Sequence, residues 1–394
     1  MENYLEYQQQ KEKNETNEET FTIKKFEKEN NLKFLIAELN PKEELSTLLL
    51  NITSAITYGN YLITGDNIGN INIYSLEGQK LINILACPIK EKINALDIDD
   101  DGDYIFAGLS NGNIIIYDLS KDKYKLINIS EYTKSLINLK IMDKIDSKTF
   151  RIISSDEEGN VFSIIIKLQN FLFSNTKVEI ICEKEKYPTL LIYPLKFKEK
   201  EIKSKNLNKY VALGNLQNVT LYSLDPKIKA IFTFEKPDNI TYSCMPDITI
   251  GLYNESSELE NDKLCLLLAV SWDKIIKLFI IPIIDNKIGD PKLFGHYIND
   301  IEIIRIGILN SGTIFLVDKS GNFKLLNAKN LIIDEPKINE DLSTSINSKD
   351  NNQCELQNAM KIDGIILRQM ILNSDKDELI ILTNKKIYKL SILF

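Results

Sequence analysis

The feature that most constrains the fold is an internal repeat. The segment Leu62–Leu76 aligns without a gap with Ile105–Leu119, so that two glycines and a tyrosine recur 43 residues later. The same pattern returns, with looser spacing, in Ile152–Ile164, Val211–Tyr222, Leu267–Leu278, Ile314–Leu325 and Leu379–Leu390. Repeats of this kind fold as similar units that bury their apolar faces against one another, so the repeat predicts an array of such units.

Each unit reads as an apolar strand, a tight turn often closed by Gly-Asn, and a second strand of alternating apolar and polar residues, as in Gly112-Asn113 and its flanks. This pattern predicts a β-hairpin with a primed turn. Dividing about 364 residues by seven units leaves about 52 residues for each, which suits four-stranded propeller blades with insertions. We therefore expect an all-β fold, a seven-bladed WD-like β-propeller over residues 31–394.

The ends of the chain and three insertions complete this organisation. Residues 1–30 are rich in Glu, Lys, Gln and Asn and predict a flexible polar tail, with room for a short helix over Phe21–Lys28. Polar loops are expected over residues 196–209, 254–263 and 340–353. Because an open sheet leaves an unpaired edge, we expect Leu32–Ala37 to pair beside Ile387–Leu393 and close the ring.

Composition excludes several classes of protein. With 48 basic against 56 acidic residues and a pI near 5.1, the chain is not expected to present a general nucleic-acid-binding face. It begins without the apolar core of a signal peptide and has no run of about 18 apolar residues, so we expect a soluble cytoplasmic protein. Five cysteines without a C-x-x-C pair predict reduced, buried thiols: Cys87, Cys182, Cys244, Cys265 and Cys354.

The sequence offers one candidate metal site. Asp97, Asp99, Asp101 and Asp103 alternate like the first half of a calcium loop, in which oxygen ligands surround a hard cation. The twelfth position, where that loop needs a bidentate Glu, is Gly108, and the segment lies between two predicted strands. We therefore favour an Asp-Gly turn over a metal site.

Two further patterns resemble enzyme motifs. Ser154–Gly159 is similar to the Asp-box turn of glycosidase propellers, but its Gly is one position too far along, which favours a structural turn. His296 is the only histidine, so a His-ligated metal site would lack a second imidazole. With no phosphate-binding glycine motif either, we expect a protein that is not an enzyme, with no catalytic residue, no cofactor and no metal ligand.

Two patterns remain as candidate contact surfaces. Trp272-Asp273 falls in a predicted hairpin turn, where an exposed Trp would anchor a partner, although a Trp that covers the core is favoured. The basic segment Lys196–Lys209 is suited to an acidic partner or an anionic membrane, although a solvated loop is favoured. No partner-binding residue is assigned.

Several short sequence segments resemble those of one known family, the vacuolar protein sorting-associated protein 8 family. Ser155–Phe162 looks like its D-x-G-G-x-V-F element, and Ala107–Leu119 is similar to its glycine-bounded strand pair. Val211–Pro226 with Ile231–Pro237, and Leu309–Asp318 with Leu325–Lys329, resemble two further segments of that family. The matches fall in order across about residues 50–330.

The resemblance implies a subunit of the CORVET tethering complex, whose amino-terminal propeller helps to engage an early-endosomal Rab GTPase. The partners it implies are that Rab and other tethering subunits, with peripheral association on endosomal membranes through them. Family members continue into an α-solenoid and a RING-type zinc domain, of which this sequence shows no pattern. Two alternatives stay open: a WD-like scaffold of an unrelated assembly and, less favoured, a propeller hydrolase of the glycosidase type.

Overall fold

A computed structural model describes residues 23–26 and 33–39, most of 51–327, and the strands of 355–393. Within 51–327 the gaps are 78–79, 88, 129–133, 169–173, 184, 196–208, 241, 243, 256–262, 285–286 and 309–313, and within 355–393 they are 362–366, 374–377 and 384–386. The regular secondary structure of these residues consists of β-strands, and no α-helix occurs among them. The predicted all-β class is confirmed.

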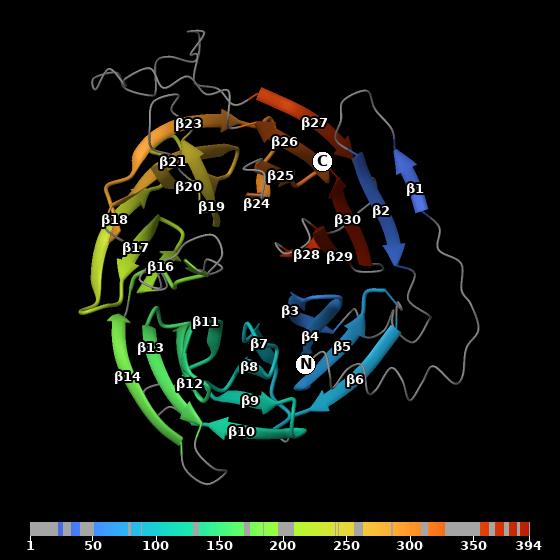
Figure 1. The fold of residues 1–394 in the computed structure, drawn as a ribbon, viewed down its shortest axis with the longest axis vertical. Coiled ribbons are helices and arrows are strands. Elements are labelled where there is room, and N and C mark those ends of the chain that lie inside the picture. Colours follow the sequence, from blue (N-terminus) through green and yellow to red (C-terminus); the bar gives the residue numbers. More distant parts are fainter. Residues whose placement is uncertain are drawn as a thin grey trace. The chain divides into compact units, whose positions relative to one another are not determined.

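The chain divides into two compact units, Met1–Ile192 with Ile366–Phe394, and Tyr193–Ile365. Three sheets of the first unit each contain four consecutive antiparallel strands (Figure 1). They are β3 (Ile52–Tyr58), β4 (Tyr61–Asp66), β5 (Asn70–Ser75) and β6 (Lys80–Ala86); β7 (Ile93–Ile98), β8 (Tyr104–Leu109), β9 (Ile114–Asp118) and β10 (Lys123–Ile127); and β11 (Leu136–Asp146), β12 (Thr149–Asp156), β13 (Val161–Leu168) and β14 (Ser174–Cys182). A fourth sheet joins the two ends of the chain, in the order β1 (Ile23–Phe26), β2 (Lys33–Leu39), β30 (Ile387–Leu393), β29 (Glu378–Thr383) and β28 (Leu367–Asn373).

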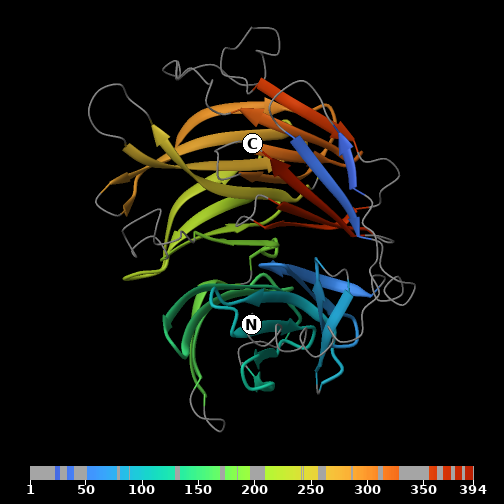
Figure 2. The ribbon, with the colours of Figure 1, turned by 45° about the vertical axis from the view of Figure 1, so that its right-hand side comes forward.

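The second unit repeats the same plan (Figure 2). Its sheets are β15 (Leu191–Pro194), which starts at the boundary, with β16 (Tyr210–Gly214), β17 (Asn218–Ser223) and β18 (Lys229–Glu235); β19 (Pro246–Glu255), β20 (Lys263–Trp272) and β21 (Ile275–Ile284), with β22 (Lys287–Ile288) and β23 (Lys292–Ile298) both paired to β21; and β24 (Ile303–Ile308), β25 (Ile314–Asp318), β26 (Asn322–Asn327) and β27 (Glu355–Lys361). Hydrogen bonding thus groups the described strands of both units into seven sheets.

The repeated segments of the sequence form the two central strands of these sheets, as predicted. Leu62–Leu76 contains β4 and β5, and Ile105–Leu119 contains β8 and β9. The other five repeats supply β12–β13, β16–β17, β20–β21, β25–β26 and β29–β30. The hairpins were predictable because their paired residues lie at most 18 positions apart along the chain, as Thr149 and Lys167 do.

The predicted pairing of the chain ends is confirmed, and the predicted helix is wrong. β2 pairs antiparallel with β30, with Ile36 opposite Leu390. Residues 23–26, inside the segment predicted as a tail with a short helix, form β1, which pairs with the free edge of β2. An exposed strand edge offers hydrogen bonds that local composition does not reveal. Of the predicted polar loops, residues 196–208, 256–262 and 340–353 lie outside the described residues.

The turns between central strands are stabilised by a recurring aspartate. Asp156 Oδ1 accepts hydrogen bonds from the backbone N–H groups of Glu158 (3.0 Å) and Asn160 (2.9 Å), and Asn160 Nδ2 donates to Asp156 Oδ2 at 2.8 Å. Asp66 with Asn70, and Asp318 with Asn322, repeat this arrangement. The turns therefore have three residues that end in a left-handed Gly, such as Gly159 at φ +85°, and the predicted primed turn is wrong at these places.

The core lies between neighbouring sheets and uses both faces of each strand. Leu62 packs in a cluster with Tyr74, Ile380 and Leu382, whereas the next residue, Ile63, packs with Ile105 and other residues of the β7–β10 sheet. Successive side chains of a strand point to opposite faces, so a strand covered on both sides is apolar throughout. This explains the continuous apolar runs of the repeat.

The cysteines of the described residues are free thiols, as predicted. Cys87, Cys244 and Cys265 are buried and Cys182 is half-buried. Burial raises the pKa of Cys87 and of Cys244, which keeps both thiols protonated at neutral pH. The fifth, Cys354, lies outside the described residues.

Candidate functional site

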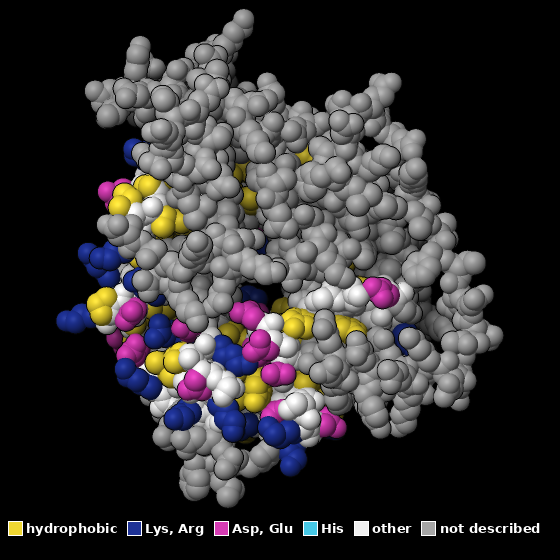
Figure 3. Space-filling model, in the orientation of Figure 1, with side chains coloured by type: hydrophobic (Ala, Val, Ile, Leu, Met, Phe, Trp, Pro, Cys, Tyr) yellow, Lys and Arg dark blue, Asp and Glu magenta, His cyan; other side chains and the backbone are white. Residues whose placement is uncertain are grey.

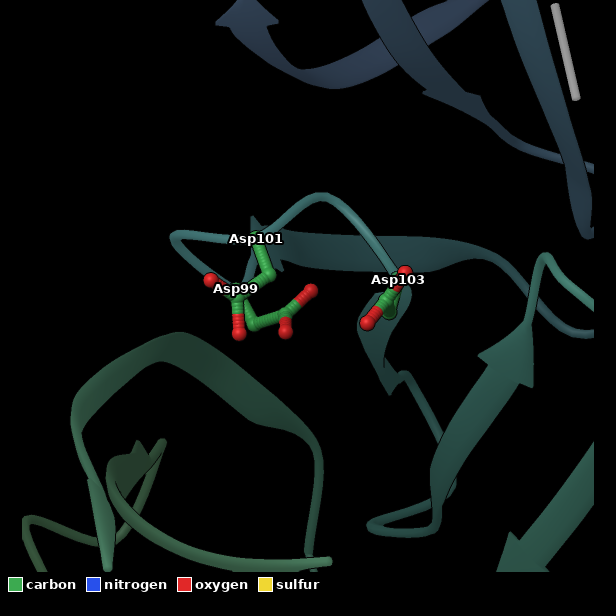
Figure 4. A group of neighbouring side chains, drawn as sticks. All are labelled: Asp99, Asp101 and Asp103. Carbon is green, nitrogen blue, oxygen red and sulfur yellow. The ribbon is translucent and has the colours of Figure 1, made fainter. Parts of the chain in front are cut away.

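The segment between β7 and β8, which we call the acidic turn (Asp99–Asp103), brings three carboxylates together. One carboxylate oxygen each of Asp99, Asp101 and Asp103 lies within 4.8 Å of the others (Figure 4). Asp99 is buried, Asp103 is half-buried and Asp101 is exposed. Among the described residues, this is the group of carboxylates close enough to hold a metal ion.

Backbone hydrogen bonds shape the acidic turn. Asp99 Oδ1 accepts from the N–H of Tyr104 at 2.7 Å, and the N–H of Gly102 donates to the carbonyl of Asp99 at 2.9 Å. Gly102 has φ +72°, and a Cβ there would lie 2.6 Å from the ring of Tyr58. Only glycine suits that position, so the predicted Asp-Gly turn is confirmed.

A lysine from the next sheet supplies the cation of this cluster. Lys144, on β11, places its Nζ 2.5 Å from Asp101 Oδ2 and 3.3 Å from Asp99 Oδ2. Burial raises the pKa of Asp99, and the Tyr104 hydrogen bond and the Lys144 charge offset part of that rise. Burial alone would lower the pKa of Lys144, but its hydrogen bonds to Asp101 and Asp99 and their charges raise it overall. The ammonium is thus held in its charged form.

This geometry favours a structural role for the acidic turn over a calcium site. Calcium takes six to eight oxygen ligands, whereas the turn brings three carboxylates together and two of them already bind Lys144. Both carboxylate oxygens of Asp99, the buried member, already accept hydrogen bonds, from the Tyr104 N–H and from Lys144 Nζ. The arrangement fastens β7 to β11.

Two aspartates, half-buried Asp97 and buried Asp247, join neighbouring sheets in a related way, a role that the sequence did not indicate. Asp97 Oδ2, on β7, accepts from the N–H of Ile141 on β11 at 2.7 Å, and Lys140 Nζ lies 3.4 Å from Asp97 Oδ1. The first strands of two neighbouring sheets, β7 and β11, are thereby joined in the first unit.

The second unit repeats this contact. Asp247 Oδ2, on β19, accepts from the N–H of Ile306 on β24 at 2.8 Å, and Arg305 lies 3.3 Å from Asp247 Oδ1. One sequence pattern could have predicted both contacts: an aspartate in the apolar first strand of one sheet, and a basic residue followed by Ile in the first strand of the next sheet.

The other residues that the sequence offered as candidates lie in turns, in strands or in the core. Ser155 Oγ donates to the carbonyl of Thr189 at 2.8 Å and Asp156 holds its turn, so the Asp-box segment is a structural turn as predicted. Trp272 is buried in the core, also as predicted. His296, on β23, lies opposite Lys277 of β21. Apart from Lys209, the basic segment 196–209 lies outside the described residues.

The surface over β7–β14 mixes charges of both signs. Figure 3 shows basic and acidic side chains interspersed there, with apolar groups between them. Several contacts are ion pairs at the surface, such as Lys121 with Asp118 at 2.6 Å and Lys134 with Glu158 at 3.7 Å. A surface that follows a nucleic-acid backbone would instead carry basic side chains gathered in a patch or stripe.

Comparison with known proteins places the chain in a family. A family model described as the Vps8 beta-propeller matches residues 50–391, which covers all the repeated segments. The chain belongs to this Vps8 β-propeller family. The family resemblance found in the sequence is thereby confirmed, and the matched range contains the acidic turn and both aspartates that join sheets.

Solved structures agree on the fold. The β-propeller domain of Cps50 (Swd1) from Myceliophteria thermophila superposes with a TM-score of 0.55 at 12% identity, over 87% of this chain and 96% of that one. A chain of the Mitotic Checkpoint Complex superposes with a TM-score of 0.56 at 11% identity, over 88% of this chain and 87% of that one. At these identities the likeness shows the fold alone, a β-propeller.

A curated relative matches a smaller part of the chain. The Lethal(2) giant larvae protein homolog SRO77 of Saccharomyces cerevisiae is 30% identical over 78 residues. The match spans 20% of this chain and 8% of that relative's length. Within the described residues, no helix is long and apolar enough to cross a membrane.

Proposed function

We propose that this Vps8-family propeller is the non-catalytic protein-interaction domain of an endosomal vesicle-tethering subunit. It binds an early-endosomal Rab GTPase, other CORVET-type tethering subunits, or both. The protein works in the cytoplasm and reaches endosomal membranes through these partners. The observation that carries the proposal is the family match over residues 50–391.

The proposal takes residues 31–394 as one propeller in which the seven sheets serve as seven blades, preceded by a polar segment over residues 1–30. Blades of paired strands form a rigid scaffold, and the loops that connect them present variable side chains to a partner. A protein-interaction role needs no catalytic group, cofactor or metal.

The use of the acidic side chains supports the absence of catalysis. A hydrolase of the glycosidase type needs two carboxyl groups that face an open substrate site. Here Asp99 and Asp101 bind Lys144, while Asp97 and Asp247 join neighbouring sheets. These four carboxylates already have structural partners among the described residues.

The second candidate function is a WD-like scaffold of an unrelated assembly. It shares the fold with the first candidate, and the comparison with solved structures is equally compatible with it. The two differ in one respect: a scaffold of another assembly has no preference for a Rab GTPase or for its nucleotide state.

The deciding experiment is a pull-down of a panel of Rab GTPases, loaded with GTP or GDP analogues, on the immobilised 394-residue chain. Selective, GTP-dependent capture of an early-endosomal Rab is the expected result. The fluorescence of the single tryptophan, Trp272, verifies that the immobilised chain is folded, because this side chain is buried. A folded chain that captures no Rab, or captures every Rab in both nucleotide states, would contradict the Rab proposal and favour the scaffold.

A further inference from the structure

The outer edge of β14 is left open by the fold. β14 is the last strand of its four-stranded sheet, and one of its edges pairs with β13 (Figure 1). Among the described residues, no strand pairs with its other edge. An open edge of this kind presents a row of backbone N–H and C=O groups that can pair with a strand of another chain. We call it the β14 edge.

Most other outer strands have a feature that hinders such pairing. In β6, β18, β23 and β27 the register slips at the third of seven residues, so that each strand contains a bulge. A bulge bends and twists the strand, which protects an exposed edge. β10 has five residues, of which Lys123 and Lys125 have like charge, and the outer edge of β2 is covered by β1.

β14 lacks this protection. Its residues 174–180 pair with β13 in one unbroken register, and the slip comes at Ile181, the eighth of nine residues. Seven residues of an antiparallel strand extend over about 23 Å. Among the outer strands of the described sheets, β14 therefore offers the longest unbroken edge.

The side chains of β14 form one charged face and one less polar face. Lys177 and Glu179 lie on the first face, with Nζ and Oε1 2.6 Å apart and the side chains 68% and 40% exposed. Thr176, Val178 and Ile180 alternate with them on the second face, where Ile180 is 51% exposed. One Lys and one Glu leave the strand without net charge, so no excess of one charge protects its edge.

The order of these residues is complementary to itself. If a two-fold axis passes through Val178, β14 of a second copy runs antiparallel to the first, and Lys177 of each copy lies opposite Glu179 of the other. Opposite residues of an antiparallel pair point to the same face, so both ion pairs can form. Ile180 then lies opposite Thr176 of the second copy.

Neighbouring registers lack this complementarity. An axis through residue 177 would place two lysines directly opposite each other, and an axis through residue 179 would place two glutamates there. Like charges at opposite positions destabilise a strand pair. The charges thus select the register centred on Val178.

We infer that two copies of this chain associate through the β14 edge, antiparallel and with a two-fold axis at Val178. The two four-stranded sheets then form one continuous sheet of eight strands. Backbone hydrogen bonds supply the affinity of such strand addition, and the side chains fix its register. The occupant is a second copy because β14 itself carries the complementary charges. The inference goes beyond Rab binding and does not depend on it.

Sedimentation velocity of the 394-residue chain tests the association over about 1 to about 100 μM. One strand edge buries less surface than the roughly 1,200 Å² of a standard stable interface, so we expect a monomer–dimer equilibrium with a dissociation constant in the micromolar range.

Charge reversal locates the interface. Lys177→Glu and Glu179→Lys each place like charges opposite each other twice, because the dimer is symmetric, and each should weaken self-association at least about tenfold. A chain with both changes regains opposite charges and should dimerise within about threefold of the wild type. An equimolar mixture of the two single variants should form a heterodimer at least about tenfold tighter than either homodimer.

Two controls accompany these variants. Lys229→Glu makes the same charge change on β18, an outer strand that also carries a glutamate, Glu235, but contains the bulge; it should leave self-association within about twofold. Trp272 fluorescence verifies that each variant is folded, because Trp272 is buried and the changed side chains at 177 and 179 are exposed.

Four results would overturn the inference. The first is a wild-type chain that stays monomeric up to about 100 μM. The second is a dimer whose affinity neither single charge reversal changes, and the third is an equal loss in Lys229→Glu, which would assign the contact to β18 or to net charge. The fourth is a mixture of the two single variants that forms no heterodimer, because the charges would then not lie opposite each other.

Discussion

Replacement of Asp247 tests how neighbouring sheets of the second unit are held together. This buried carboxylate on β19 accepts hydrogen bonds from the backbone N–H of Ile306 on β24 (2.8 Å) and of its neighbour Ile248 (3.0 Å), and Arg305 lies 3.3 Å away. Asp247→Ala removes the acceptor and leaves the Ile306 N–H buried. Asp247→Asn keeps one acceptor oxygen and removes the charge.

The expected losses follow from these contacts. A buried N–H without an acceptor costs about 1–3 kcal/mol, and the ion pair adds at most about 1 kcal/mol because the Arg305 side chain is 38% exposed. Asp247→Ala should therefore lower the free energy of unfolding by about 1–4 kcal/mol. Asp247→Asn should lose no more than about 1 kcal/mol, because its amide oxygen still accepts the Ile306 N–H.

The pH dependence adds an independent check. Burial raises the pKa of Asp247, and the nearby Arg305 charge offsets only part of that rise. The folded state therefore binds a proton more tightly than the unfolded chain does. The wild type should lose stability relative to Asp247→Asn as the pH rises from about 4 through the folded-state pKa, because Asn does not titrate.

Urea unfolding followed by Trp272 fluorescence measures these effects, since Trp272 lies at the end of β20 beside the start of β19. The midpoint shift multiplied by the urea dependence gives the change in free energy. Equal stability of the wild type and Asp247→Ala would refute the reasoning. So would an Asn variant as unstable as the Ala variant, because the hydrogen bond to Ile306 would then contribute nothing.

Two further changes test the turns of the first unit. Gly159→Ala should lower the free energy of unfolding by at least about 2 kcal/mol, because position 159 has φ +85° and a Cβ there would clash with the backbone carbonyl of Glu185. Glu158→Ala, in the same turn, should change the free energy of unfolding little, and the urea midpoints of the two variants measure the difference. Lys144→Met should lower the free energy of unfolding by about 1–3 kcal/mol at pH 7, because the buried Asp99 carboxylate then loses its cationic partner. The loss should be smaller at about pH 4, because the pKa of Asp99 rises further without Lys144 and its protonated form needs no cation. Exposed Lys148→Met is the control, and an equal loss at both pH values would contradict this account.

Much of the strand pattern was predictable because it depends on local chemistry. The alternation around Gly65 and Gly108, and the residues that close each turn, predicted the central hairpins of the sheets. The exact turn was missed: the sequence shows the Gly-Asn pair, but the hydrogen bonds from Asn160 to Asp156 require the aspartate side chain to fold back over a three-residue loop.

The contacts between sheets were not predictable in the same way. Lys144 reaches Asp99 across 45 positions and Ile306 reaches Asp247 across 59. At such separations, many polar residues are equally plausible partners, and only the packing of one sheet against the next selects among them. β1 was missed for the same reason, since its partner is the free edge of β2 and its own four residues are too few to show a strand pattern.

The sequence by itself determined the repeat, the all-β class, the central hairpins and the family, because each of these depends on the order of residues within short segments. The tertiary structure decided which carboxylates are buried and paired, and it placed β14 at the open outer edge of its sheet. The physical reason is that desolvation and charge pairing depend on distances between side chains from different strands, which the packing of the sheets sets.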